Sequence, residues 1–212
     1  MYKLLTVFIV CVLSSDVFSR PVSYPDGWTF MSMNDGFKNS IHIHYSPSAK
    51  YSVGYKGEYW REDKSQTHAV QLNNLLKRWN KKHSQANLYL KSGLGFVYSG
   101  YQSFNSDIGP VVFAGIATDW ETRKYFVSYE NRFMKSKKIK NNFRQKGRVG
   151  IAPYIANFGE LHTWLMLEID HAPKEVNEFT VTPLIRLFKG PSLFETGYSS
   201  KGIFLFNFVY RF

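Results

Sequence analysis

Two pairs of potential metal ligands lie close together near the start of the chain. Met31-x-Met33 is followed by a predicted turn at 34–36 and then by His42-x-His44. In an extended strand the members of each pair point to the same side, about 6.8 Å apart. Thioether sulfur and imidazole nitrogen together favour copper, particularly Cu(I). If the two segments form a hairpin, the four side chains are a candidate copper site; otherwise they are ordinary residues of a strand wall.

The residue patterns of the common catalytic sites are missing. His83 and Ser84 are adjacent, and His162 and Glu168 share one face of a predicted strand, but that second pair has no serine beside it. The G-x-S-x-G motif is absent. We therefore predict a protein that is not an enzyme and assign no catalytic residue, although a triad assembled from separate strands would escape this search.

The most basic segment, KSKKIKNNFRQK at 135–146, holds six basic residues and no acidic one. We predict a loop here. Such a loop can contact the phosphates of lipopolysaccharide through charge-assisted hydrogen bonds, bind nucleic acid, or be no more than a solvated charged surface. The candidate lipopolysaccharide contacts are Lys135, Lys137, Lys138, Lys140, Arg144 and Lys146.

The first nineteen residues are typical of a secretory signal peptide. Lys3 provides the positive start, 4–13 form an apolar stretch, and Val17 and Ser19 suit the positions before a cleavage site. We predict cleavage after Ser19 and a mature domain at 20–212. That domain has no cysteine, because Cys11 lies within the signal, and no apolar run long enough for a transmembrane helix.

The elements that position these residues are strands. Aromatic residues make up 17% of the chain, although its mean hydropathy is only −0.30. Apolar and polar residues alternate along about a dozen stretches. In KYFVSYENRF, for example, Tyr125, Val127 and Tyr129 share one face, and Glu130 and Arg132 share the other. The predicted strands are 28–33, 39–46, 50–60, 66–78, 85–97, 110–120, 123–133, 148–156, 161–169, 177–188, 192–199 and 203–212.

The charged faces of these strands contain both signs, with bases in excess. If the apolar faces point to lipid, the charged faces line a narrow lumen, either as a salt-bridge network or as a small channel with a slight preference for anions. The predicted lumen-lining residues are Lys56, Glu58, Lys91, Lys124, Glu130, Arg132, Arg148, Glu168 and Arg186.

The chain ends in GIFLFNFVYRF, in which Phe204, Phe206, Phe208, Tyr210 and Phe212 alternate with other residues. This ending resembles the signal that bacterial outer-membrane proteins present to the barrel-assembly machinery. We also expect short turns at the end carrying both termini, including one at 157–160, and longer loops at the other, as in outer-membrane barrels. The chain thus resembles Gram-negative outer-membrane β-barrel proteins, without a defined subfamily.

The resemblance implies an all-β fold: a transmembrane antiparallel up-and-down barrel of twelve strands, or of ten if 28–33 and 192–199 pair irregularly. It implies a non-catalytic porin-like or structural protein of the outer membrane, in contact with lipids and lipopolysaccharide but not with nucleic acid. The alternatives are a copper-binding barrel, a lipid hydrolase like the outer-membrane phospholipases, and a soluble β-sandwich or lipocalin-like barrel whose apolar face points inward.

Overall fold

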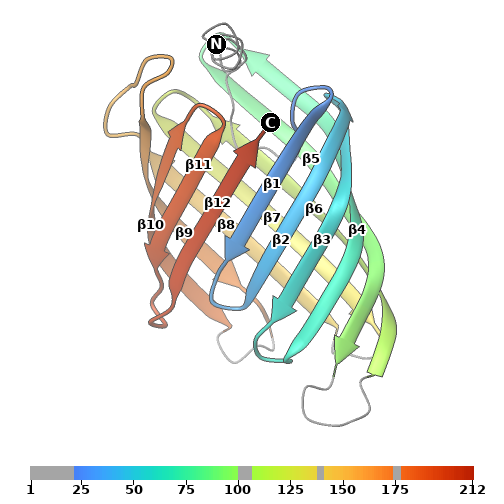
Figure 1. Cartoon of the computed structure of the whole chain (residues 1–212). Coiled ribbons are helices and arrows are strands. Elements are labelled where there is room, and N and C mark those ends of the chain that lie inside the picture. Colours follow the sequence, from blue (N-terminus) through green and yellow to red (C-terminus); the bar gives the residue numbers. More distant parts are fainter. Residues whose placement is uncertain (1–21, 100–106, 138–140, 174–177) are drawn as a thin grey trace, which may run out of the picture.

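The protein is a single closed barrel of twelve antiparallel strands (Figure 1). The computed structural model describes residues 22–99, 107–137, 141–173 and 178–212, so the predicted signal peptide lies outside the described residues. Among the residues described, no helix is long and apolar enough to span a bilayer. The strands are β1 (Gly27–Asn34), β2 (Lys38–Ser48), β3 (Tyr51–Trp60), β4 (Ser65–Lys81), β5 (Ser84–Ser99), β6 (Asp107–Glu121), β7 (Tyr125–Ser136), β8 (Asn142–Ile151), β9 (His162–His171), β10 (Phe179–Lys189), β11 (Ser192–Tyr198) and β12 (Phe204–Arg211).

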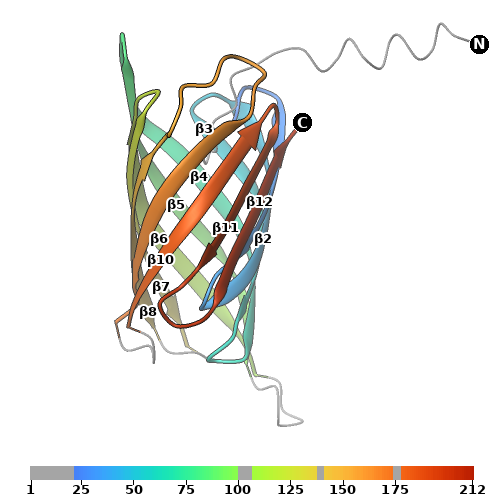
Figure 2. The same cartoon turned by 90° about the vertical axis from the view of Figure 1, so that its left-hand side faces the viewer.

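Pairing between β1 and β12 closes the sheet. Thr29 stands opposite Arg211, and the register continues to Asn34 opposite Phe206. Trp28 and Phe212 exchange two backbone hydrogen bonds, at 2.7 and 3.0 Å, just beyond this register. β1 and β11, the two strands with the weakest sequence pattern, pair without interruption with both neighbours. Twelve strands is therefore the correct count and ten is wrong. The strands are inclined to the barrel axis, as closure requires (Figure 2).

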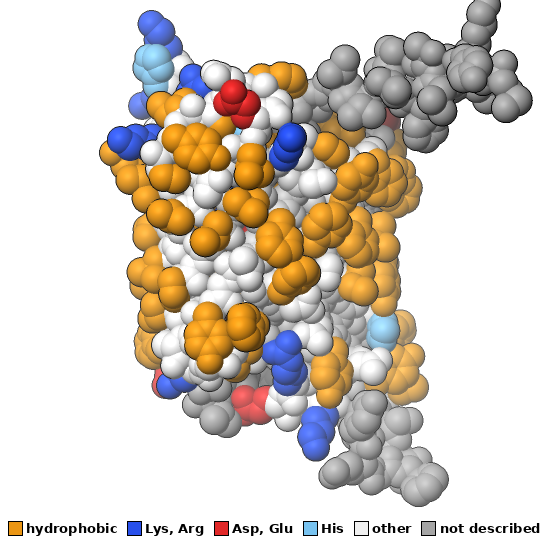
Figure 3. Space-filling view, turned by 60° about the vertical axis from the view of Figure 1, so that its left-hand side comes forward, with side chains coloured by type: hydrophobic (Ala, Val, Ile, Leu, Met, Phe, Trp, Pro, Cys, Tyr) orange, Lys and Arg blue, Asp and Glu red, His pale blue; other side chains and the backbone are white. Residues whose placement is uncertain are grey.

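The apolar faces of the strands point outward. In β12, Phe204 and Phe206 are exposed, whereas the odd-numbered Leu205, Asn207 and Val209 are buried. Hydrophobic side chains cover the middle of the wall in Figure 3, and the charged side chains in view lie nearer its two ends. The lipocalin-like and β-sandwich alternatives are wrong, because both require the aromatic row to face inward.

The connections differ between the two ends of the barrel. We call the end at which β1 begins and β12 finishes the termini end, and the opposite one the distal end. At the termini end the connections are 49–50, 82–83, 122–124, 152–161 and 190–191; at the distal end they are 35–37, 61–64, 100–106, 137–141, 172–178 and 199–203. The expectation of uniformly short turns at the termini end fails at 152–161, since β8 ends at Ile151 rather than at residue 156.

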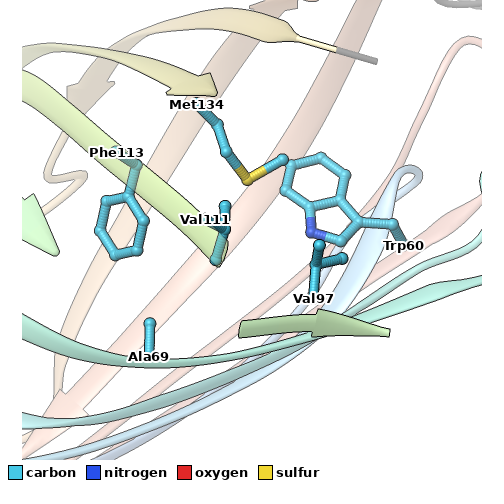
Figure 4. Packing of buried hydrophobic residues seen from close by; sticks show 6 residues of the cluster. All are labelled: Trp60, Ala69, Val97, Val111, Phe113 and Met134. Carbon is cyan, nitrogen blue, oxygen red and sulfur yellow. The ribbon is translucent and has the colours of Figure 1, made fainter. Parts of the chain in front are cut away.

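The interior is not uniformly polar. On one wall near the distal end, Trp60, Val97, Val111, Phe113 and Met134 pack with Ala69 into a buried apolar cluster (Figure 4). A second cluster nearer the termini end contains Trp164, Met166, Leu184 and Leu205, together with Ala152. These inward-facing apolar residues narrow the lumen and leave the charged residues to occupy the space between the clusters.

Candidate functional site

A cavity of about 260 Å³ runs along the barrel interior. Its lining includes Asp35 and Trp60 at the distal end and Glu121 and Leu193 at the termini end, so one space reaches residues of both ends. The walls combine apolar side chains with many charged ones. A narrow passage with fixed charges of both signs is the site that the fold presents.

Glu195 is the centre of a buried network on β8 to β12. Its carboxylate, on β11, accepts hydrogen bonds from Arg186 at 2.6 Å, from Asn207 at 2.8 Å and from Arg148 at 3.2 Å. Arg148 also donates to Glu168 of β9 at 2.5 Å. Because Glu195 and Glu168 are each only 2% exposed, their charges are compensated by these neighbouring donors rather than by solvent.

A second network crosses the lumen near the distal end. The carboxylate of Glu58, on β3, accepts hydrogen bonds from Lys38 at 2.5 Å and from Arg132 of β7 at 2.7 Å. Lys56 is more distant, with its Nζ 3.6 Å from the carboxylate. The Arg132 guanidinium also lies over the Phe113 ring at 4.0 Å. Since β3 and β7 are four strands apart, this contact joins strands that are not neighbours in the wall.

The turn between β1 and β2 reaches into the distal mouth. Asp35 Oδ1 accepts hydrogen bonds from the backbone amides of Phe37 and Lys38, and Oδ2 accepts one from Arg144 of β8 at 3.0 Å. Burial alone would raise the pKa of Asp35, but Arg144, Lys146 and Lys38 lower it well below the usual range. The Arg144 guanidinium lies over the Phe37 ring at 4.4 Å. The turn and β8 therefore form a latch across this mouth.

The termini end is also narrowed. Val22 is buried inside the barrel against Tyr89 of β5 and Ala117 of β6, with Leu75 of β4 packed beside them. The amide of Ser23 donates to the Ser46 hydroxyl at 3.1 Å. Residues 22 and 23 therefore enter the barrel before the chain turns into β1.

The structure places eight of the nine predicted lumen residues in the interior. Lys91 pairs with Glu130 at 2.8 Å, and the others take part in the networks around Glu58, Glu168 and Glu195. Lys124 differs: it is exposed in the 122–124 turn, where its Nζ lies 5.9 Å from the centre of the Tyr125 ring. The predicted strand 123–133 starts two residues too early, because β7 begins only at Tyr125.

The predicted basic loop is mostly strand. β8 begins at Asn142, so Arg144 and Lys146 point into the barrel, where Arg144 pairs with Asp170 and Lys146 lies 3.2 Å from Glu168. Their assignment to a lipopolysaccharide-contacting loop is wrong, because carboxylates on β9 draw them inward. Lys135 is exposed on β7 and Lys137 is exposed beyond it. Lys138 and Lys140 lie outside the described residues.

Several interior charges were missed in the sequence: Asp35, Lys38, Asp170 and Glu195, in addition to Arg144 and Lys146. The sequence does indicate that Glu195 faces inward. In the stretch SLFETGY, Leu193 and Glu195 share one strand face, and Ser192, Phe194 and Thr196 share the other. Asp35 carried no such signal, since it lies in a turn and reaches the lumen only through the shape of that turn. Ion pairs among the described interior residues include several that join basic side chains to Asp35, Glu58, Glu130, Glu168, Asp170 and Glu195.

The predicted metal ligands come together in part. β1 and β2 form the expected hairpin, in which Met31 stands opposite His42 and Met33 stands opposite Ser40. Both methionines and His42 line the cavity. The described residues contain no group of three or more His, Cys, Asp or Glu arranged to hold a metal. A metal at this position would therefore depend on thioether sulfur for its further ligands.

The residues considered for catalysis are dispersed. His83 is exposed in the turn at the termini end and Ser84 begins β5 beside it. His162 faces inward and packs against Phe188, with ring centres 5.8 Å apart, whereas Glu168 is held by Arg148 and Lys146. Neither pair forms an arrangement in which a base activates a nucleophile.

Comparison with known proteins adds two structures of similar fold. No protein-family model matches the chain, and no curated protein matches it either. A KdgM porin in complex with disordered oligogalacturonate is 10% identical, over 87% of this chain and 96% of that one, with a TM-score of 0.46. The translocator domain of the autotransporter NalP from Neisseria meningitidis is 8% identical, over 87% and 83%, with a TM-score of 0.42. At these identities and TM-scores neither likeness supports a conclusion about this chain, and the fold is established by its own strand pairing. That fold, a closed barrel with an even number of antiparallel strands, is the architecture of outer-membrane barrels, as the alternation and the terminal aromatic row predicted.

Proposed function

We propose that the chain is a non-catalytic, porin-like barrel of the bacterial outer membrane whose narrow charged lumen passes small ions and solutes. The observation that carries this proposal is the cavity lined by residues of both barrel ends, inside a wall whose outer face is apolar. An outward apolar band is stable against acyl chains, and a polar interior is typical of pores. The termini end faces the periplasm in this proposal.

Eight basic but only four acidic side chains line the cavity, and this imbalance supports a modest preference for anions. Lys56 is the clearest contributor, because its ammonium group lies 3.6 Å from the nearest carboxylate, farther than Lys38 or Arg132. Lys56 also lines the cavity. The other basic side chains in the interior ion pairs lie closer to their carboxylates than Lys56 does. Their positive charge is therefore more fully compensated, and they attract a passing anion less strongly.

Two surface features belong to the same proposal. Lys135 and Lys137, exposed near the distal end, contact lipopolysaccharide phosphates. The exposed aromatic residues of β12, together with Phe212 directly after it, present the chain to the barrel-assembly machinery. A purely structural envelope barrel is the competing interpretation, favoured by the constrictions formed by Val22 at one end and by Asp35 at the other.

Planar bilayer recordings separate these two possibilities. The chain from residue 20 onward is refolded and inserted, and its reversal potential is measured across a KCl gradient. For the wild type we expect a small conductance with a preference for anions. Asp35→Asn is expected to conduct more, because the contact between Asp35 and Arg144 across the distal mouth is weakened. Lys56→Met is expected to show a weaker preference for anions. Glu178→Gln, an exposed carboxylate at the same end, is the control and leaves conductance unchanged. Silent bilayers with both the wild type and Asp35→Asn would rule out the pore and favour the structural role.

A further inference from the structure

His42 and His44 form a close pair of buried imidazoles on β2. Their ring centres are 4.5 Å apart, and the two side chains are 7% and 0% exposed. Met31 stands directly opposite His42 on β1, and Met33 is the next inward residue along that strand. Directly opposed residues on antiparallel strands have Cβ atoms about 5 Å apart, and diagonal neighbours remain within reach of long side chains. The hairpin thus gathers two imidazoles and two thioethers on one stretch of the inner wall.

Three of the four imidazole nitrogens of this pair have no hydrogen-bond partner within the protein. Nε2 of His42 and both ring nitrogens of His44 are buried and unpaired. Two other histidines differ: His68 bonds to the Tyr55 hydroxyl at 2.6 Å, and His171 bonds to Gln145 at 2.8 Å. A buried polar atom without a partner is destabilising, so three such atoms in one pair form a place that a bound ligand would stabilise.

The charges around the pair restrict which ligand fits. Lys56 stands in register beside His42, and its charge is only partly offset by Glu58. Lys91 and Arg211 add further positive charge near the pair. Repulsion from a nearby cation is half as large for a monovalent ion as for a divalent one. Since no carboxylate completes the set, the available donors are imidazole nitrogen and thioether sulfur. This combination favours a soft monovalent ion over Zn²⁺ or Mg²⁺.

We propose that His42, His44 and Met31 bind one Cu(I) ion on the inner wall of the barrel. His42 and both methionines line the cavity, so an ion in the lumen reaches the site without passing through the wall. The site does not depend on ion conduction through the barrel, because a closed barrel open to solvent at one mouth can bind copper equally well.

The test is a Cu(I) titration of the folded chain from residue 20 onward, in detergent, without oxygen and with a chromophoric Cu(I) chelator as competitor. We expect one equivalent to bind. Met31→Leu, which conserves volume, weakens binding at least tenfold, and His44→Ala abolishes it. His162→Ala is the matched control, since His162 also lines the lumen but lies outside the proposed site, and it leaves the affinity unchanged. Zn²⁺ binds more weakly than Cu(I).

Two further measurements keep the test decisive. The gel mobility of the unheated protein establishes that each variant is folded, so that loss of binding in His44→Ala is not caused by misfolding. X-ray absorption of bound copper shows at least one sulfur neighbour in the wild type and loses that signal in Met31→Leu. Absence of Cu(I) binding in the wild type, or equal affinity in folded Met31→Leu, overturns the proposal and leaves water as the partner of the imidazoles.

Discussion

Buried carboxylates in the lumen are held by several donors each, which makes single residues important for stability. Glu195 accepts hydrogen bonds from two guanidinium groups and one amide, and Glu58 is held by an arginine and a lysine. A charge taken out of water is tolerated only while such partners remain. Removal of one member therefore leaves the other members buried and uncompensated.

Glu195→Gln is expected to lower the free energy of unfolding by about 3 kcal/mol, because Arg148 and Arg186 lose their shared carboxylate. Urea titration of the refolded protein in detergent measures the change. Glu178→Gln, exposed in the connection between β9 and β10, is the control and changes stability by less than about 0.5 kcal/mol. Equal stability of the two variants would mean that solvent already screens the interior network.

Asp35 gives the latch a defined pH dependence. Its pKa in the folded protein lies below the ordinary value of about 3.9, so its contribution to stability is present above that value and is lost as pH falls through the lower, folded pKa. The stability difference between wild type and Asp35→Asn therefore shrinks between about pH 5 and pH 2. Unfolding titrations of both proteins across this range measure it. A difference that is constant with pH would show that Asp35 is not paired with Arg144.

At the scale of the strands, local alternation predicted most of the wall but failed where charges form the inner face. Eleven predicted strands overlap the observed ones over most of their length. β8 is the exception, because Arg144 and Lys146 lie among other basic residues and resemble a loop until Glu168 and Asp170 of β9 are placed beside them. In β4 a bulge between Leu75 and Lys77 changes the phase of the strand. Simple alternation along β4 would place Lys77 on the inward face. Beyond the bulge, Lys77 is instead exposed, and Arg78 donates a hydrogen bond to Asn87 at 2.7 Å.

Packing between neighbouring strands sets the shape of the distal cluster. Gly93 of β5 stands opposite Phe113 of β6, and a Cβ at Gly93 would lie 2.2 Å from the Phe113 ring. The ring therefore occupies the space above the glycine, where it also supports Arg132.

Gly93→Val forces the ring to move and is expected to destabilise the barrel by about 1–3 kcal/mol through overpacking. Urea unfolding measures the loss. Gly147→Ala is the comparison, because nothing lies within 4 Å of a Cβ placed at Gly147. If both substitutions had the same small effect, the close approach of Phe113 to Gly93 would not be part of the native packing.

For the whole molecule, the direction of the two faces was predictable and the contacts across the lumen were not. Within each strand, the alternation of apolar and polar residues shows which face meets lipid. The outward position of Phe204 and Phe206 therefore follows from the local sequence. Contacts such as Asp35 with Arg144, or Glu58 with Arg132, join strands that are far apart around the wall. They depend on strand tilt and barrel closure, which no single segment specifies.

The orientation of the strands is tested most directly by single-cysteine scanning of β12 in lipid vesicles. The chain from residue 20 onward contains no cysteine, so each introduced thiol carries the only fluorescent label. With a quencher attached to the lipid tails, the account predicts strong quenching at 204, 206, 208 and 210 and weak quenching at 205, 207 and 209. Strong quenching at the odd-numbered positions, or none at either set, would contradict the placement of the aromatic face against lipid.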